Sequence, residues 1–242
     1  LAPEHSRNFS GGFVVNPTPA FEITTDVYRI GITDRIVLSD NFTGGRITAL
    51  LTPLGASGAR FFTNAIDTRT TGVDVTAAYM FDMASSSTLR VSSAYNHNKT
   101  ALVRVLPTPP ELVGFENTLF SSIPPNDLER RRFTCAQPKD SFRLNGEFTR
   151  GHFGANVHEN LYGKYCSLEA IDQTYSTNWV TDFETYYRAG SSTLTFGVQN
   201  VFNKFPDEMI PAVAFNNIRT FPRNSPYGFN GRFLYGRISY QF

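Results

Sequence analysis

The sequence predicts an all-β protein, a transmembrane β-barrel built as an antiparallel meander. Apolar and aromatic residues alternate with polar residues along most of the chain, and short turns and long loops follow one another between these runs. The last run puts Ile238, Tyr240 and Phe242 on one face and Arg237, Ser239 and Gln241 on the other. A two-residue period of this kind fits a strand with one face on lipid and the other on a wet lumen.

The bulk composition agrees with alternation and excludes some other classes. Aromatic residues make up 14% of the chain, yet the mean hydropathy is only -0.25. No stretch approaches the roughly 18 uninterrupted apolar residues of a membrane-spanning helix. Lys and Arg total 22 against 21 Asp and Glu, so no net field would attract nucleic acid, and we expect no nucleic-acid partner.

Four strands are predicted in the first half of the chain. The first covers residues 4–15 and ends at the turn 16–19, where Pro17 and Pro19 stop the ladder. The second, 20–38, places Tyr28, Ile30 and Ile32 opposite Arg29 and Gly31, and it leads into a long loop at 39–59. The third, 60–81, has the clearest alternation, from Val73 to Phe81, and turns at 82–87. The fourth, 88–104, opens into the longest loop, 105–138.

Five more strands are predicted in the second half. Phe142, Leu144 and Phe148 mark the fifth, and a turn near 149–151 joins it to the sixth, which reaches about Tyr162. A loop at 163–172 precedes the seventh, about 173–188, and the turn 189–191 leads to the eighth, which contains Phe196. The loop 203–227 precedes the closing strand. The total is about nine strands.

The alternation of connections predicts the topology. All short turns fall at one end of the strands and all long loops at the other, as in outer-membrane barrels with periplasmic turns and extracellular loops. A soluble sandwich or jelly roll also alternates and is the competing prediction. Nine antiparallel strands cannot close, and an open edge in lipid costs several kcal/mol per unpaired group. We therefore expect a C-terminal piece of a longer polypeptide, whose upstream strands complete the barrel.

Several segments carry family motifs in a fixed order. Residues 70–74 read Thr-x-Gly-x-Asp within the segment 61–75, and 200–206 read Asn-Val-Phe-Asn-Lys-Phe-Pro. Residues 26–36 and 225–232 fit the same order, and the final Phe242 is similar to a barrel assembly signal. Together these segments resemble the strands of TonB-dependent outer-membrane receptors.

The resemblance implies a 22-stranded barrel plugged by an N-terminal domain, of which residues 1–242 would supply about the last nine strands without the plug. It implies TonB-dependent uptake of a scarce large solute across the bacterial outer membrane, with a ferric siderophore favoured. A passive porin-type channel is the alternative function. The implied partners are the upstream strands and plug of the same polypeptide, TonB through that plug, and outer-membrane lipid and lipopolysaccharide.

Two sets of residues in the predicted loops are candidates for a site. Cys135 and Cys166 lie in loops on the same side, and an oxidising compartment favours a disulfide, with free thiols or separate roles as alternatives. Arg104 and the run Arg130, Arg131 and Arg132 are predicted to line an extracellular vestibule that attracts an anionic ligand. A solvated surface or a contact with lipopolysaccharide phosphates is the other interpretation of the basic run.

Two sets of strand residues have predicted structural roles. Near the short turns, the aromatic residues Tyr79, Phe81, Tyr187, Tyr240 and Phe242 are predicted to form a membrane girdle. The charged residues that we expect to face the lumen are Asp74, Arg143, Glu147, Asp182, Glu184 and Arg237.

The sequence gives little support to catalysis, and we expect neither an enzyme nor a cofactor. No Gly-x-Ser-x-Gly elbow or phosphate-binding loop occurs. A barrel phospholipase using His97 and a nearby serine is the remaining enzymatic alternative. His152 and His158 stand about 20 Å apart along one strand, at roughly 3.3 Å per residue, so they cannot share a metal ion.

Overall fold

Nine strands form one antiparallel sheet in chain order, which confirms the predicted meander. The computed structural model describes residues 1–39, 41–84, 86–107, 128–169, 171–214 and 219–241. The strands of the sheet are β1 (His5–Thr18), β2 (Phe21–Leu38), β3 (Phe62–Met83), β4 (Ser87–Val105), β5 (Asp140–Arg150), β6 (Phe153–Tyr162), β9 (Asn178–Ala189), β10 (Ser192–Gln199) and β11 (Phe233–Tyr240).

Smaller elements lie in the long connections between the strands of the sheet. They are α1 (Gly45–Leu51), η1 (Thr52–Leu54), α2 (Leu128–Thr134), β7 (Tyr165–Cys166), β8 (Thr174–Tyr175) and η3 (Pro211–Val213). The seventh predicted strand, 173–188, is too long, because Thr174 and Tyr175 pair with β7 as a separate two-stranded sheet. Within the described residues, no helix has the length and apolar character needed to cross a membrane.

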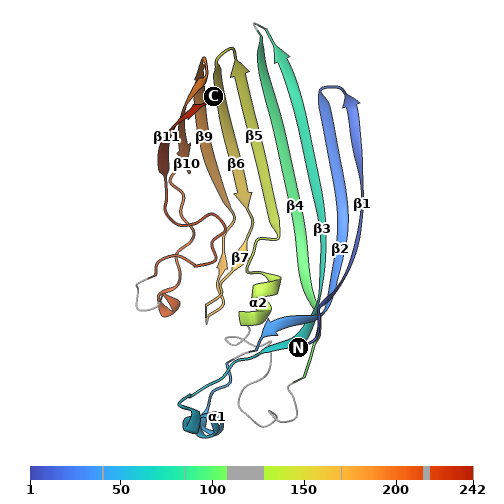
Figure 1. Ribbon diagram of the computed structural model, residues 1–242, viewed down its shortest axis with the longest axis vertical. Coiled ribbons are helices and arrows are strands. Elements are labelled where there is room, and N and C mark those ends of the chain that lie inside the picture. The colour runs from blue at the N-terminus through green and yellow to red at the C-terminus, as the bar shows by residue number, and fades with distance from the viewer. Residues whose placement is uncertain (40, 85, 108–127, 170, 215–218, 242) are drawn as a thin grey trace.

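The connections sort by length between the two ends of the sheet. Figure 1 shows the four hairpin turns at the upper end and the long connections, with α1 and α2, at the lower end. Two of the turns use glycine in the left-handed region, Gly151 at φ 57° and Gly190 at φ 60°, where a side chain would be strained. The two ends are called the turn end and the loop end below.

The two faces of the sheet differ in chemistry. One row across β2, β3, β4 and β5 joins Asp26, Asp74, Asn96 and Ser141, and these side chains share the polar inner face. The next row toward the turn end joins Thr25, Val75, Tyr95 and Phe142, which share the opposite, outer face. By the same register, all the charged residues predicted to face the lumen lie on the inner face, namely Asp74, Arg143, Glu147, Asp182, Glu184 and Arg237.

At the loop end of β2, the alternation runs opposite to a simple lipid-facing pattern. Ile30 and Ile32 face inward and line a cavity with Phe133 of α2, whereas Arg29 and Gly31 face outward. Phe133 packs against the cluster formed by Val37, Phe42, Ile47, Ala65 and Ile66. The apolar side chains of this part of β2 are therefore covered by an inward-folded helix and do not need lipid.

Three glycines on the inner face lie under tyrosine rings of the neighbouring strand. The pairs are Gly72 with Tyr28, Gly154 with Tyr186, and Gly197 with Tyr235, and a Cβ at any of these glycines would overlap the ring. The hydroxyl of Tyr235 donates to the carboxylate of Glu184 at 2.7 Å. Glycine at these positions lets a large ring lie flat on the sheet, and at Gly197 the ring holds a charged group on the inner face.

Replacing one of these glycines is expected to lower the stability of the sheet. In Gly197→Val the ring of Tyr235 must move and lose its hydrogen bond to Glu184, which we expect to cost about 1–3 kcal/mol of unfolding free energy. Denaturant unfolding of the detergent-solubilised protein measures it. Gly146→Val is the matched control, since a Cβ at Gly146 meets nothing within 4 Å. Equal losses in the two variants would contradict the packing argument.

Candidate functional site

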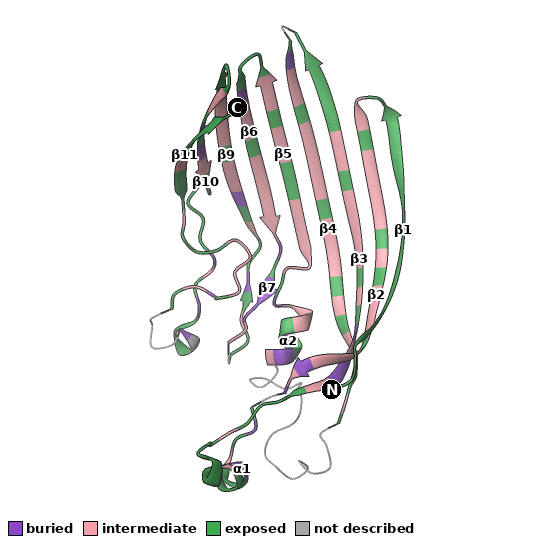
Figure 2. Cartoon of the chain, in the orientation of Figure 1, coloured by how far each residue is buried: buried purple, intermediate pink, exposed green. Residues whose placement is uncertain are grey.

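Most of the buried residues lie at the loop end, among the long connections (Figure 2). We call this assembly the loop layer; it comprises the described parts of residues 39–61, 128–139, 163–177 and 200–232. Two clusters form its interior, one around Phe42 and Ile66 and the other around Tyr165, Tyr175 and Met209. The loop layer is thus a packed structure, on which a ligand surface can be held in place.

Glu129 of α2 joins the first long loop to the second. Its side chain is buried, and its carboxylate lies 3.1 Å from Nη2 of Arg60 and 3.1 Å from Nε of Arg132. A buried carboxylate is stable only with such partners, because desolvation penalises an unpaired charge. Arg60 therefore ties α2 to the first long loop, and Arg132, on the same helix, completes the pairing of the carboxylate.

Arg131 joins the second loop to the third. Its side chain is 2% exposed, and Nη1 and Nη2 donate to the backbone carbonyl oxygens of Ser167 at 2.6 Å and Glu169 at 2.7 Å. The carboxylate of Asp172 lies 3.7 Å from Nη1. The guanidinium thus holds α2 against the segment that carries β7 and β8.

The two cysteines join the same pair of loops covalently. Cys135 and Cys166 form a disulfide, with Cα atoms 5.3 Å apart. The amide of Cys166 also donates to the carbonyl oxygen of Cys135 at 2.8 Å. Asn224, from the last long loop, donates to the carbonyl oxygens of Ala136 at 2.9 Å and Cys166 at 3.0 Å. One small region therefore holds three loops together.

Tyrosines fill the interior of the loop layer. The ring centroids of Tyr165 and Tyr175 lie 4.9 Å apart, and the ring centroids of Tyr162 and Tyr227 lie 5.3 Å apart. Burial raises the pKa of Tyr165 to about 12 and raises the pKa of Tyr227 as well. These phenols stay neutral at physiological pH, so they support the layer by packing and contribute no negative charge.

A cavity of about 570 Å³ opens beside the disulfide. Its cationic lining residues are Arg130, Arg131, Lys139 and Lys164, and its carboxylates are Asp140 and Asp172. Arg131 is engaged in the contacts described above, whereas Arg130, Lys139 and Lys164 form no ion pair with another described residue. The cavity therefore has a positive surplus. The two lysines, which flank the disulfide-bonded segments, were not predicted from the sequence.

The arginines predicted to line one vestibule are separated. Arg104, at the end of β4, binds Asp67 at 2.6 Å and Asp34 at 2.8 Å and does not line the cavity beside the disulfide. Arg131 is buried and Arg132 is paired with Glu129. Only Arg130 presents an exposed guanidinium to the cavity. The single-vestibule prediction is therefore too broad, because most of these arginines are occupied by contacts within the protein.

The Asp67 carboxylate makes the folding stability of the protein depend on pH. Hydrogen bonds from Arg104 hold the pKa of Asp67 below its ordinary value of 3.8. Because the pKa of Asp67 is lower in the folded state than in the unfolded state, the Asp67–Arg104 pair stabilises the folded state fully at pH values above the unfolded pKa. This stabilisation is lost as the pH falls through the folded pKa.

We therefore expect Arg104→Gln to reduce stability at neutral pH, and this loss to shrink below about pH 4 as Asp67 protonates in both proteins. Denaturant midpoints of wild type and variant, measured from pH 7 to pH 3, give the difference. A difference that is unchanged across this range would contradict the role assigned to Asp67.

The histidines have local partners. Nδ1 of His97 lies 2.7 Å from the carboxylate of Asp140, and that of His158 lies 2.7 Å from the side-chain oxygen of Asn145. The His152 ring lies 6.1 Å from the Tyr187 ring. No serine hydroxyl bonds to His97, and no group of three metal-ligating side chains occurs, in the part of the chain that the structure describes.

Four of the five predicted girdle residues lie on the outer face near the turn end. Tyr79, Phe81, Tyr187 and Tyr240 are all solvent-exposed, and the rings of Tyr79 and Phe81 lie 4.3 Å apart. Phe242 lies outside the described residues.

Solved structures with the same fold are transporters and receptors. The chain is similar to the FrpB iron transporter from Neisseria meningitidis, with a TM-score of 0.62 and 15% identity over 99% of this chain and 31% of that one. It is similar to the copper transporter OprC, with a TM-score of 0.60 and 13% identity over 99% of this chain and 31% of that one. It is also similar to the ferric yersiniabactin uptake receptor FyuA from Yersinia pestis, with a TM-score of 0.53 and 12% identity over 98% of this chain and 28% of that one. The chain spans about a third of the length of these proteins.

The low identities to these solved structures show a shared fold only, whereas a match to a family model shows the family. A comparison with curated proteins finds no match. The family described as "TonB dependent receptor-like, beta-barrel" matches residues 1–201, which is most of the chain. This family consists of transporters and receptors and not of enzymes, which excludes the alternative that the chain is a barrel phospholipase. The chain belongs to the TonB-dependent receptor family, as part of its β-barrel.

Proposed function

We propose that this chain is the C-terminal part of a receptor for TonB-dependent uptake of a scarce large solute across the bacterial outer membrane. In this proposal the loop end is extracellular and the turn end is periplasmic. Strands upstream of β1 complete the barrel, and a plug domain of the same polypeptide contacts TonB. The observation that carries the proposal is the loop layer, whose four long loops are tied to one another at the end where a solute would arrive.

The positive surplus of the cavity beside the disulfide supports an anionic solute. Arginine and lysine side chains bind carboxylate and phosphate groups through charge-assisted hydrogen bonds, which are roughly twice as strong as neutral ones. A ferric siderophore, which is a large and commonly anionic chelate, fits this surface and is the cargo we favour. The iron named for FrpB and FyuA supports this choice, and the copper named for OprC keeps a second metal among the cargoes to be tested.

Uptake of labelled iron tests the proposal in the native host. Deleting the gene is expected to abolish uptake of the ferric chelate that this receptor takes, and deleting TonB is expected to abolish it equally. Uptake that needs this protein but persists without TonB would establish the passive porin-type channel instead. A screen of ferric siderophores, with copper chelates in parallel, identifies the cargo.

Charge reversal tests the cavity. The double variant Arg130→Glu and Lys164→Glu is expected to weaken binding of an anionic chelate by about tenfold or more, because two attractive contacts become repulsive. Lys204→Glu is the matched control, since Lys204 is an exposed cation outside this cavity. Equal binding by all three proteins would mean that the cavity is not the binding surface.

A further inference from the structure

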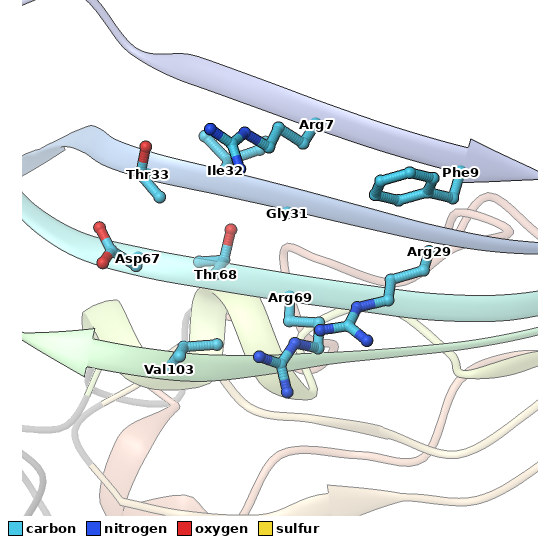
Figure 3. Close-up of a pocket in the computed structure, with 10 residues that line it drawn as sticks. All are labelled: Arg7, Phe9, Arg29, Gly31, Ile32, Thr33, Asp67, Thr68, Arg69 and Val103. Atoms are coloured by element: carbon cyan, nitrogen blue, oxygen red, sulfur yellow. The ribbon is translucent and has the colours of Figure 1, made fainter.

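Three arginines gather on the outer face, away from the loop layer. A groove of about 370 Å³ crosses β1, β2 and β3, and its lining residues include Arg7, Arg29 and Arg69 (Figure 3). We call it the arginine groove. By register, Arg7 and Arg69 flank Gly31 in one row across the three strands, and Arg29 lies in the next row, paired with Phe9 and Thr71. The side chains of Arg29 and Arg69 extend toward each other in Figure 3.

Among the residues that the structure describes, these three guanidiniums have no partner of their own. None of them forms an ion pair or hydrogen bond with another described residue, and all three are exposed. The carboxylate that lines the groove, Asp67, is held by Arg104 at 2.6 Å. Lys99 pairs with Thr71 across β3 and β4, so a fourth cation lies in the same row as Arg29.

Gly31 leaves the middle of the groove open. A Cβ at this position would meet only the carbonyl oxygen of Arg7, at 3.9 Å, which is ordinary contact. The chain therefore does not need glycine there for its backbone. Its effect is to leave a gap between Arg7 and Arg69 that an anion of phosphate size can enter.

The height of the groove matches the edge of the hydrocarbon layer. Arg69 is ten residues from the girdle residue Tyr79 on the same face of β3, and the side chains between them on that face are uncharged. Ten residues span roughly 33 Å along a strand, which a tilt of about 40° reduces to about 25 Å, the height of the apolar band of such barrels. The groove thus lies where the headgroups of the leaflet at the loop end begin.

Apolar side chains continue from the groove toward the turn end. Phe9, Phe13 and Val27 are 71%, 58% and 56% exposed on the outer face. Phe9 lines the groove itself, and Gly11 between the two phenylalanines leaves open space. A strand that pairs with β1 would extend the sheet sideways and leave this face uncovered. The surface therefore combines a cationic pocket with an apolar strip below it.

We propose that the arginine groove binds the phosphorylated headgroup of an outer-leaflet glycolipid of the lipid A type, whose acyl chains lie along Phe9, Phe13 and Val27. Arginine forks bind phosphate oxygens in pairs, and three of them around an open gap exceed what a general preference for headgroups requires. The inference rests on the outer-membrane setting of the proposed function but not on TonB, on the cargo or on the loop layer. It assigns the outer face of β1 to β3 a specific lipid partner.

Lipid retention by the purified receptor tests the proposal. The receptor is extracted from the outer membrane, delipidated, and titrated in detergent with bis-phosphorylated lipid A, and bound lipid is counted by native mass spectrometry. We expect Arg29→Gln with Arg69→Gln to weaken binding by at least about tenfold. Gly31→Leu is expected to weaken it similarly while keeping every charge, because the leucine fills the gap. Arg150→Gln, on the outer face at the turn end, should bind as wild type does.

The probes separate the sources of phosphate. Lipid A without phosphate should bind at least tenfold more weakly, and inorganic phosphate should compete only at concentrations far above those of the lipid. Unchanged binding in both groove variants, or equal binding of phosphate-free lipid, overturns the proposal. Membrane fractionation is the independent check on the setting: a receptor found in the outer membrane with unaltered lipid binding refutes the groove alone, whereas absence from that membrane refutes the proposed function.

Discussion

Replacing Arg131 by methionine is expected to release α2 from the third long loop. The variant keeps most of the apolar stem but removes the donors that reach the carbonyl oxygens of Ser167 and Glu169. Hydrogen bonds to a charged group contribute about 1.5–3 kcal/mol each, and the side chain is almost completely buried. We therefore expect a local loss of about 3–5 kcal/mol in the loop layer.

Hydrogen exchange of the full receptor measures this loss where it occurs. Amides of residues 128–136 and 163–169 should exchange about a hundredfold faster or more, while those of the strands at the turn end should not change. Arg130→Met is the control on the same helix, since Arg130 is exposed. If both variants exchange alike, Arg131 does not hold the loops together. If Arg131→Met alone loosens the loops, we also expect it to bind cargo more weakly, because Arg131 lines the cavity.

The sheet could be predicted from the sequence because a two-residue period and turn residues are local signals. They gave the number of strands, their order and the side on which Cys135 and Cys166 meet. Local alternation shows which residues share a face but not what that face touches. Ile30 and Ile32 alternate as lipid-facing residues do, yet α2 covers them from inside.

The loop layer could not be predicted for a related reason. Arg130, Arg131 and Arg132 are identical neighbours in the sequence, and the phase of a seven-residue helix decides that one is exposed, one buried and one paired. The arginine groove was also missed, because Arg7, Arg29 and Arg69 lie on three strands and meet only through the register. Such sites depend on long-range pairing, which a single sequence does not display.

Removing the disulfide is expected to have an effect of similar size to the loss of Arg131 but a different cause. Cys135 and Cys166 are 31 residues apart, and closing a loop of that length lowers the entropy of the opened state by an amount worth about 3.7 kcal/mol. In the native receptor the strands β5 and β6 already restrain both ends of the loop, so the measured loss should fall below this value. Reduction should therefore loosen the loop layer without unfolding the barrel.

Cys135→Ser with Cys166→Ser separates the bond from the packing around it. We expect faster exchange of residues 163–169 and weaker binding of the anionic chelate, because the cavity lined by Arg130 and Lys164 lies against the bridge. Reducing the wild type should reproduce the double variant, and reducing the variant should change nothing further. Wild-type binding and exchange that survive complete reduction would mean that the hydrogen bonds of Arg131 and Asn224 alone hold the three loops together.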